Sequence, residues 1–356
     1  MYRYIGNKTK LLPVLMDVFA EEAPPNATVV DLMSGTGSVS VALRKQGYHV
    51  IASDMMTYSK HHLVTQLLLD TPPSFQKLKT HLNIGNTESF GYEAVLEYLN
   101  SLPEKESYFF NEFSPDGIPS NGSPSRKYFT SQNAKKIDAI REQLNIWIEN
   151  DLITPEEESV LKHTLIMAVN DVANISGTYG YFLSKFNANS LEAIVLKPIQ
   201  FVSEGSIENT VIQGFAEDIA SSITADVCYI DPPYMKRQYA ANYHILETIA
   251  RGDFPRTIGK SGLRDWWDQH SKFCTKTKIR ESFSKVITEM NCNKFIISYS
   301  EDGLLSLDEL IELFSSFGDV MYRTIEYSRF RSNNSNLSKK FNEYIIILTK
   351  RRKSVG

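Results

Sequence analysis

The 356 residues carry a formal net charge of -4, and 42% of them are hydrophobic, 11% aromatic and 22% charged. These values are typical of a folded globular protein. They exclude a disordered chain, a collagen-like fibre and a polycation that binds phosphate through its overall charge. The chain has no apolar run of about 18 residues, no secretory signal and no CxxC pair among its three cysteines. We therefore expect a cytoplasmic protein with no membrane association, no disulfide framework and no metal site.

The first predicted elements form a strand, a turn, a helix and a second strand within 30 residues. Residues 28–31 are a short β-branched run that indicates a buried parallel strand. A turn of small residues follows, and then a helix that ends near Gly47. The next strand covers residues 49–54. This order is a βαβ unit, which predicts a parallel sheet.

The segment 76–204 has a different pattern. It contains two helical patterns, at 134–150 and 155–172, and a turn-rich stretch between 114 and 124. We interpret it as an insertion into the sheet domain. His61 and His62 precede it, but adjacent side chains on a helix diverge, so we interpret them as structural.

Extended segments return after residue 204. Residues 227–230 predict a buried strand that ends at two prolines, and residues 295–299 predict another. The runs 320–327 and 344–349 are also extended. Strands that alternate with helical patterns make the fold class α/β. Basic residues are locally enriched at 236–280 and 321–356. This enrichment is compatible with nucleic-acid binding or with ordinary surface.

Gly35 and Gly37 lie in the turn after the first predicted strand, where glycine lets the backbone approach a ligand closely. The loop has no P-loop lysine, and Ser40 replaces the third glycine of a dinucleotide fingerprint. The loop begins with Asp31, which would repel a pyrophosphate but favours a cationic sulfonium, so we expect S-adenosylmethionine as the cofactor. Asp54, at the end of the next strand, is placed to accept hydrogen bonds from the cofactor ribose. A helix N-cap or a turn residue is the alternative role for Asp54.

The segment Asp231-Pro232-Pro233-Tyr234 follows a predicted strand, at the edge where α/β proteins bind ligands. The prolines make the turn rigid and lack N–H groups, so nearby carbonyls are left to face a ligand. The carboxylate and a carbonyl can accept both protons of an exocyclic amine, while the base stacks on the tyrosine. These hydrogen bonds free the amine lone pair for attack on a sulfonium methyl group. For this tetrapeptide alone, a strand-ending turn is the alternative.

Three segments, in this order along the chain, resemble those of the Dam-like, class-alpha adenine-specific DNA methyltransferases. Residues 3–8, with two leucines at 11 and 12, are similar to the opening motif of that family. Residues 31–37 are similar to its cofactor loop and residues 231–234 to its catalytic motif. The continuation at 237–247 is similar to a branch that accompanies type IIS restriction enzymes.

This resemblance implies a Rossmann-like, seven-stranded methyltransferase sheet, with residues 320–349 as its closing antiparallel hairpin. It implies a catalytic domain at 1–75 and 205–356 and an inserted, mainly helical target-recognition domain at 76–204. The implied catalytic residues are Asp231, Pro232, Pro233 and Tyr234. The implied cofactor-binding residues are Tyr4, Lys8, Asp31, Met33, Gly35, Gly37, Asp54, Asp218 and Ile219. Met33 and Ile219 stand where the family usually has phenylalanine.

The implied function is sequence-specific methylation of a flipped-out adenine in double-stranded DNA, in a restriction–modification or orphan modification system. The implied partners are DNA and, in a restriction–modification system, a cognate endonuclease, and we expect a monomer. The residues expected to contact DNA are Lys236, Arg237, Tyr179, Tyr181, Arg329 and Arg331. The segment 126–128 is a further candidate for reading the target.

Other chemistries remain as alternatives. Methylation of the cytosine ring needs a cysteine nucleophile, usually after proline, and no cysteine here follows proline. The exocyclic amine of cytosine suits the same geometry, although Asp231 favours adenine because related cytosine enzymes commonly carry serine there. RNA or a glutamine side chain is another substrate class, and a catalytically inactive nucleic-acid-binding module is the non-enzymatic alternative.

Overall fold

The computed structural model describes residues 8–82, 91–205, 208–328 and 340–351. The chain divides into two compact units. We call the first the sheet unit (Gly6–Leu63, Glu204–Gln238 and Gln269–Gly356) and the second the helical unit (Met1–Ile5, Val64–Ser203 and Tyr239–Asp268). The helical unit thus includes residues 64–75 and 239–268, which the sequence interpretation placed in the catalytic domain. The difference arises because the chain leaves the sheet unit twice, the second time four residues after Tyr234.

The sheet unit contains one seven-stranded sheet with the order β3-β2-β1-β4-β5-β7-β6. The expected α/β fold and seven-stranded sheet are confirmed. The five strands from β3 to β5 are parallel, and β7 is antiparallel to both β5 and β6, so the expected closing hairpin is also confirmed. The strands are β1 Thr28–Asp31, β2 His49–Asp54, β3 Thr210–Gln213, β4 Val227–Ile230, β5 Lys294–Ser300, β6 Gly318–Ser328 and β7 Lys340–Lys350.

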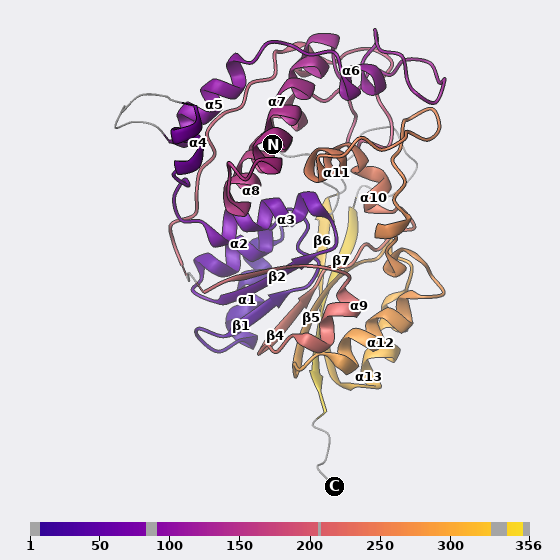
Figure 1. Ribbon diagram of the computed structural model, residues 1–356. Helices are drawn as coiled ribbons and strands as arrows, with labels where there is room; N and C mark the ends of the chain where they lie inside the picture. The colour runs from indigo at the N-terminus through magenta and orange to yellow at the C-terminus, as the bar shows by residue number, and fades with distance from the viewer. Residues whose placement is uncertain (1–7, 83–90, 206–207, 329–339, 352–356) are drawn as a thin grey trace. The chain divides into compact units, whose positions relative to one another are not determined.

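Helices cover both faces of the sheet, because the side chains of its central strands are apolar on both sides (Figure 1). On β4, Cys228 and Ile230 belong to the apolar core on one face, whereas Tyr229 points to the other face and contacts Phe19 of α1 edge-on. The helices and 3-10 turns of this unit are α1 Leu12–Glu22, α2 Ser38–Lys45, α3 Thr57–Leu63, α9 Ala216–Ile219, η3 Ala220–Ser222, η5 Lys272–Cys274, α12 Ile279–Glu289 and α13 Leu307–Ser315.

The helical unit is built around α7 and α8. Thr154 begins α8 with a capping box, in which its side chain accepts from the Glu157 N–H while the Glu157 side chain accepts from the Thr154 N–H. Its elements are η1 Val64–Leu68, α4 Gln76–His81, α5 Tyr92–Ser101, α6 Tyr108–Phe113, α7 Ser131–Glu149, α8 Pro155–Val172, η2 Asn189–Leu191, α10 Tyr239–Asn242, α11 His244–Arg251 and η4 Trp267–Gln269. The predicted helices at 134–150 and 155–172 correspond to α7 and α8.

Candidate active site

The glycine loop and the Asp-Pro-Pro-Tyr turn follow two adjacent strands. β1 and β4 pair in parallel with Asp31 opposite Tyr229, so the residues that follow these strands meet at one edge of the sheet. The chain places β2 and β3 on one side of β1, and β4 and β5 on the other. A change of direction of this kind is where open α/β sheets bind their ligands.

Hydrogen bonds hold the loop between β1 and α2. Gly35 and Gly37 have φ angles of 55° and 81°, a backbone region that favours glycine. The Gly35 N–H donates to Asp54 Oδ2 at 2.9 Å, and the Met56 N–H donates to Asp54 Oδ1 at 2.8 Å. Asp54 therefore fixes the loop and the start of α3, which is the turn role considered as an alternative. Its contact with a cofactor ribose stays a prediction.

Asp31 is a buried carboxylate with an unused acceptor. Its side chain is 1% exposed, and Oδ2 accepts from the Ser40 hydroxyl at 2.5 Å. Among the described residues, Oδ1 has no hydrogen-bond partner. Burial raises the pKa of Asp31 to about 7, with the Ser40 hydrogen bond acting against it. A cationic group beside Oδ1 would offset the cost of burying the charge, so the loop fits a cofactor with positively charged sulfur and nitrogen.

The other expected cofactor residues lie in different surroundings. Met33 is half-buried and packs against the apolar core. The Gly214 N–H donates to the Asp54 carbonyl at 3.0 Å, which holds the segment after β3 near the end of β2. In α9, Ile219 packs against the core, whereas Asp218 is exposed and lies 3.5 Å from the Lys285 ammonium.

Several contacts orient the Asp-Pro-Pro-Tyr turn. The Asp231 side chain is 15% exposed, and its Oδ1 accepts from the Tyr234 hydroxyl at 3.1 Å. The Leu304 N–H donates to the Tyr234 carbonyl at 2.9 Å, and the Tyr299 ring contacts the Tyr234 ring edge-on with centroids 5.6 Å apart. Pro232 is buried. The carboxylate and the aromatic ring are therefore held in one arrangement.

Lys8 contacts this turn. Its Nζ lies 3.2 Å from Asp231 Oδ1, donates to the Tyr234 hydroxyl and stands 4.8 Å from the centre of the Tyr234 ring. Contact of Lys8 with a cofactor, which the resemblance implies, stays a prediction, and the structure places the Lys8 ammonium beside the expected catalytic residues. Glu343 Oε2, on β7, lies 3.7 Å from the same nitrogen.

Sequence reasoning did not identify Glu343, because it lies in no motif and strand pairing alone brings it here. Burial raises the pKa of Glu343 to about 7, and the Lys8 ammonium opposes the rise. Burial also raises the pKa of Asp231, again against the effect of Lys8. One ammonium therefore lies beside two buried carboxylates.

The residues expected to contact DNA differ in exposure. Lys236 and Arg237 are exposed on the sheet unit, and Tyr181 is 55% exposed on the helical unit. Tyr179 is completely buried and its carbonyl accepts from the Tyr128 hydroxyl at 2.9 Å, so its side chain cannot touch DNA from this position. Tyr4, Arg329 and Arg331 lie outside the described residues.

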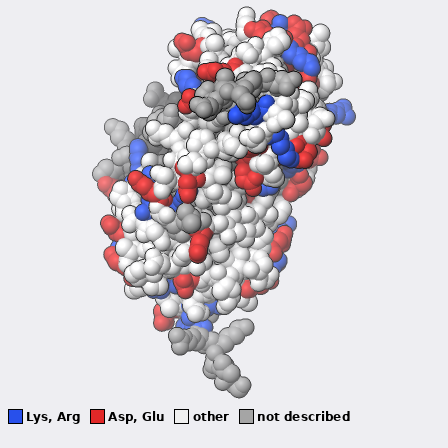
Figure 2. All heavy atoms as spheres, turned by 60° about the vertical axis from the view of Figure 1, so that its left-hand side comes forward, with Lys and Arg blue, Asp and Glu red and all other residues white. Residues whose placement is uncertain are grey.

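Arg126, a further candidate for reading the target, is also completely buried. Its Nη1 donates to Glu112 Oε2 at 2.9 Å, so in this structure it holds the helical unit together rather than facing solvent. Acidic and basic side chains are interspersed on the face shown in Figure 2, so that face does not by itself mark a DNA-binding surface.

His61 and His62 are buried in α3. In the part of the chain that the structure describes, no group of three or more His, Cys, Asp or Glu side chains is placed to hold a metal ion. Within the same ranges, no helix has the length and apolar character needed to cross a membrane.

Comparisons with known proteins identify relatives along nearly the whole chain. The family model of the D12 class N6 adenine-specific DNA methyltransferases matches residues 4–313. The type II methyltransferase M.NlaIII of Neisseria lactamica is 32% identical, over 98% of this chain and 99% of that protein. The type II methyltransferase M.FokI of Planomicrobium okeanokoites is 33% identical and the modification methylase StsI of Streptococcus sanguinis 31% identical, each over 98% of this chain. The match covers 52% of M.FokI and 52% of StsI, so this chain spans about half of their length.

Proposed function

The chain belongs to the D12 class of N6 adenine-specific DNA methyltransferases, and from this premise we propose that it methylates adenine in a specific sequence of double-stranded DNA, with S-adenosylmethionine as the donor. The observation that carries the proposal is the adjacency of two features. A glycine loop with a buried, unpartnered carboxylate oxygen follows β1, and the Asp-Pro-Pro-Tyr turn follows the neighbouring strand β4.

The residues of this edge have separate tasks. The cofactor supplies a methyl group on a positively charged sulfur, and Asp31 lies where its carboxylate favours a cation. Asp231 accepts one proton of the adenine amine in a hydrogen bond, and a carbonyl of the proline turn accepts the other. Tyr234 offers its ring to the base, and such stacking contributes about 1–3 kcal/mol. Asp231 is also placed to take up the proton that the nitrogen loses after it forms the new bond to carbon.

The cysteines do not favour methylation of the cytosine ring. All three are buried. Burial raises the pKa of Cys274 to about 12 and that of Cys292 to about 11, and it raises the pKa of Cys228 as well. A nucleophilic cysteine needs the opposite environment, one that stabilises the thiolate.

The proposal is tested with labelled S-adenosylmethionine and, in parallel, duplex DNA, RNA and protein. We expect label in DNA only, on N6 of adenine. The variant Asp231→Asn keeps the shape of the side chain but removes its charge, and we expect its rate to fall by about 100-fold or more. Label on RNA, protein or cytosine, or an undiminished rate in this variant, would refute the proposal.

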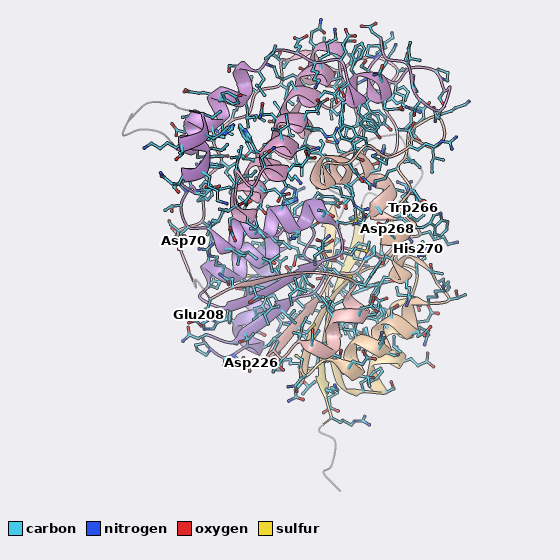
Figure 3. The ribbon with its side chains drawn as sticks, viewed as in Figure 1. Asp70, Glu208, Asp226, Trp266, Asp268 and His270 are labelled. Carbon is cyan, nitrogen blue, oxygen red and sulfur yellow. The ribbon has the colours of Figure 1, made fainter. Side chains whose placement is uncertain are left out.

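Asp226→Asn is the matched control. Asp226 lies just before β4, at the opposite end of the strand from Asp231, where its Oδ2 accepts from the Thr28 N–H at 2.8 Å (Figure 3). It therefore tests the effect of losing one carboxylate beside this strand without touching the site. We expect its rate to equal that of the wild type.

We also propose that the protein acts as a monomer in the cytoplasm and serves a modification system, with a cognate endonuclease as partner where one exists. Light scattering of the protein with and without DNA measures the first property. Sequencing of methylated adenines in an expressing host identifies the target sequence.

A further inference from the structure

The Lys8 ammonium occupies the position that the proposed reaction gives to the substrate. Its Nζ contacts Asp231 Oδ1 and the Tyr234 hydroxyl, and it lies over the Tyr234 ring. An adenine amine needs the same carboxylate, and the base needs the same ring. An amine that binds Oδ1 competes with Lys8 for this oxygen, so the ammonium has to move when the base binds in this way.

Glu343 provides a second position for this ammonium. Its side chain is 10% exposed, and its Oε2 lies 3.7 Å from Lys8 Nζ. Among the described residues, Oε2 has no hydrogen-bond partner. A buried carboxylate oxygen without a donor is costly unless a cation comes close to it.

We propose that Glu343 is a positioning residue, which receives the Lys8 ammonium when the substrate amine binds Asp231. The inference rests on the proposed function. A shift of about 1 Å would bring Nζ within hydrogen-bond distance of Oε2. The ammonium would thus exchange one carboxylate for another without leaving the buried site. Without Glu343, it would remain on Asp231 and compete with the substrate.

The groups that face Glu343 give this exchange a dependence on pH. They are Lys8, Asp231 after β4, Tyr229 on β4 and Asp302 after β5. Burial, together with Asp231 and Asp302, raises the pKa of Glu343 to about 7, and Lys8 opposes the rise. A protonated Glu343 cannot attract the ammonium. The rate of methyl transfer is therefore expected to fall as the pH decreases through this value.

The test compares wild type and Glu343→Gln in methyl transfer to duplex DNA from acidic to alkaline pH, with saturating cofactor. We expect kcat of the variant at alkaline pH to be about 10- to 100-fold lower, the range for loss of a hydrogen bond to a charged group. We expect the acidic limb of its profile to move to lower pH, because residue 343 no longer titrates and Asp231 has lost a neighbouring negative charge. Glu326→Gln, an exposed position on β6, is the control and should match the wild type.

Two further variants separate positioning from structural damage. In a Lys8→Met background, Glu343→Gln should have almost no further effect, because the two residues act through one contact. Glu343→Asp keeps the negative charge on a shorter side chain. Its pH profile should therefore keep the acidic limb of the wild type, with a kcat between those of wild type and Glu343→Gln. If Glu343→Gln does not fold, Glu343→Asp provides the test. Three results would each overturn the role of Glu343. The acidic limb of the pH profile could stay in place in Glu343→Gln, or the losses of kcat in the two single variants could multiply in the double variant. Glu343→Asp could also behave like Glu343→Gln. Wild-type protein that does not methylate DNA at all would instead refute the proposed function.

Discussion

At the scale of single residues, the burial of Asp31 makes the stability of the protein depend on pH. Its carboxylate is almost completely buried, one of its oxygens has no hydrogen-bond partner among the described residues, and its pKa is raised to about 7 from 3.8. The folded protein therefore binds this proton more tightly than the unfolded chain. The contribution of Asp31 to stability consequently decreases as the pH rises from about 4 to about 7 and is constant above that range.

The variant Asp31→Asn should remove this dependence. The difference in free energy of unfolding between the variant and the wild type should increase in favour of the variant by about 4 kcal/mol at most from acidic to alkaline pH. The variant should also bind S-adenosylmethionine more weakly than the wild type. Urea unfolding at several pH values and calorimetric titration measure the two effects. A variant whose stability parallels that of the wild type at every pH would show that Asp31 is not buried as a costly charge.

Arg126 is a second residue whose task is set by burial. Its guanidinium donates to the Glu112 carboxylate at 2.9 Å, to the Lys260 carbonyl at 2.9 Å and to the Gly259 carbonyl at 3.1 Å. Arg126→Met should lower the free energy of unfolding by about 3–5 kcal/mol, because a buried carboxylate loses its partner. The exposed neighbour Lys127 is the control, and Lys127→Ala should change stability by less than about 0.5 kcal/mol. Similar stabilities of the two variants in chemical denaturation would contradict this role.

The sequence predicted which residues lie together where these residues belong to local motifs, and it failed where only tertiary contacts bring residues together. Asp31, Gly35, Asp231 and Tyr234 belong to strand-ending turns with a recognisable composition, and the structure places them at one edge of the sheet. Glu343 lies in a strand more than 100 residues further along, with no local signal of its proximity to Lys8. The sequence also did not predict that Arg126 and Tyr179 are buried, because basic and aromatic residues in a turn-rich segment are usually exposed.

At the scale of elements, burial distinguishes the four-residue strands that the sequence predicted from the one that it missed. β1 and β4 are short β-branched or apolar runs with buried side chains, and both were predicted with their observed bounds. β3 was not predicted. It contains four residues at the edge of the sheet, none of them buried, so its sequence carries little apolar signal.

The turn after β5 packs against the Asp-Pro-Pro-Tyr turn, and Gly303 allows this close packing. A Cβ on Gly303 would lie 2.1 Å from Cε1 of Tyr299, the ring that contacts Tyr234. Gly303→Ala should therefore destabilise the protein by about 1–3 kcal/mol and reduce methyl transfer. Gly91→Ala is the control, since a Cβ there meets no atom within 4 Å. Urea unfolding and initial rates measure both effects, and equal behaviour of the two variants would contradict the assignment.

At the scale of the whole molecule, the expected cofactor residues that the structure describes all belong to the sheet unit. At a concentration about 100 times its Kd, a ligand stabilises the structure that binds it by about 2.7 kcal/mol. Hydrogen exchange should therefore slow at residues 31–40 and 231–234 when S-adenosylmethionine is added, with little change in α7 and α8. Protection confined to the helical unit would place the cofactor elsewhere.

The position of β7 has a consequence for synthesis of the protein. β7 lies between β5 and β6 in the sheet, and it carries Glu343. A ribosome must therefore translate all of β7 before this strand can insert between β5 and β6. A nascent or prematurely terminated chain that lacks these residues exposes a bare edge of β5, which favours aggregation. Incomplete translation products that lack β7 should thus aggregate or be removed by proteases rather than persist as folded protein.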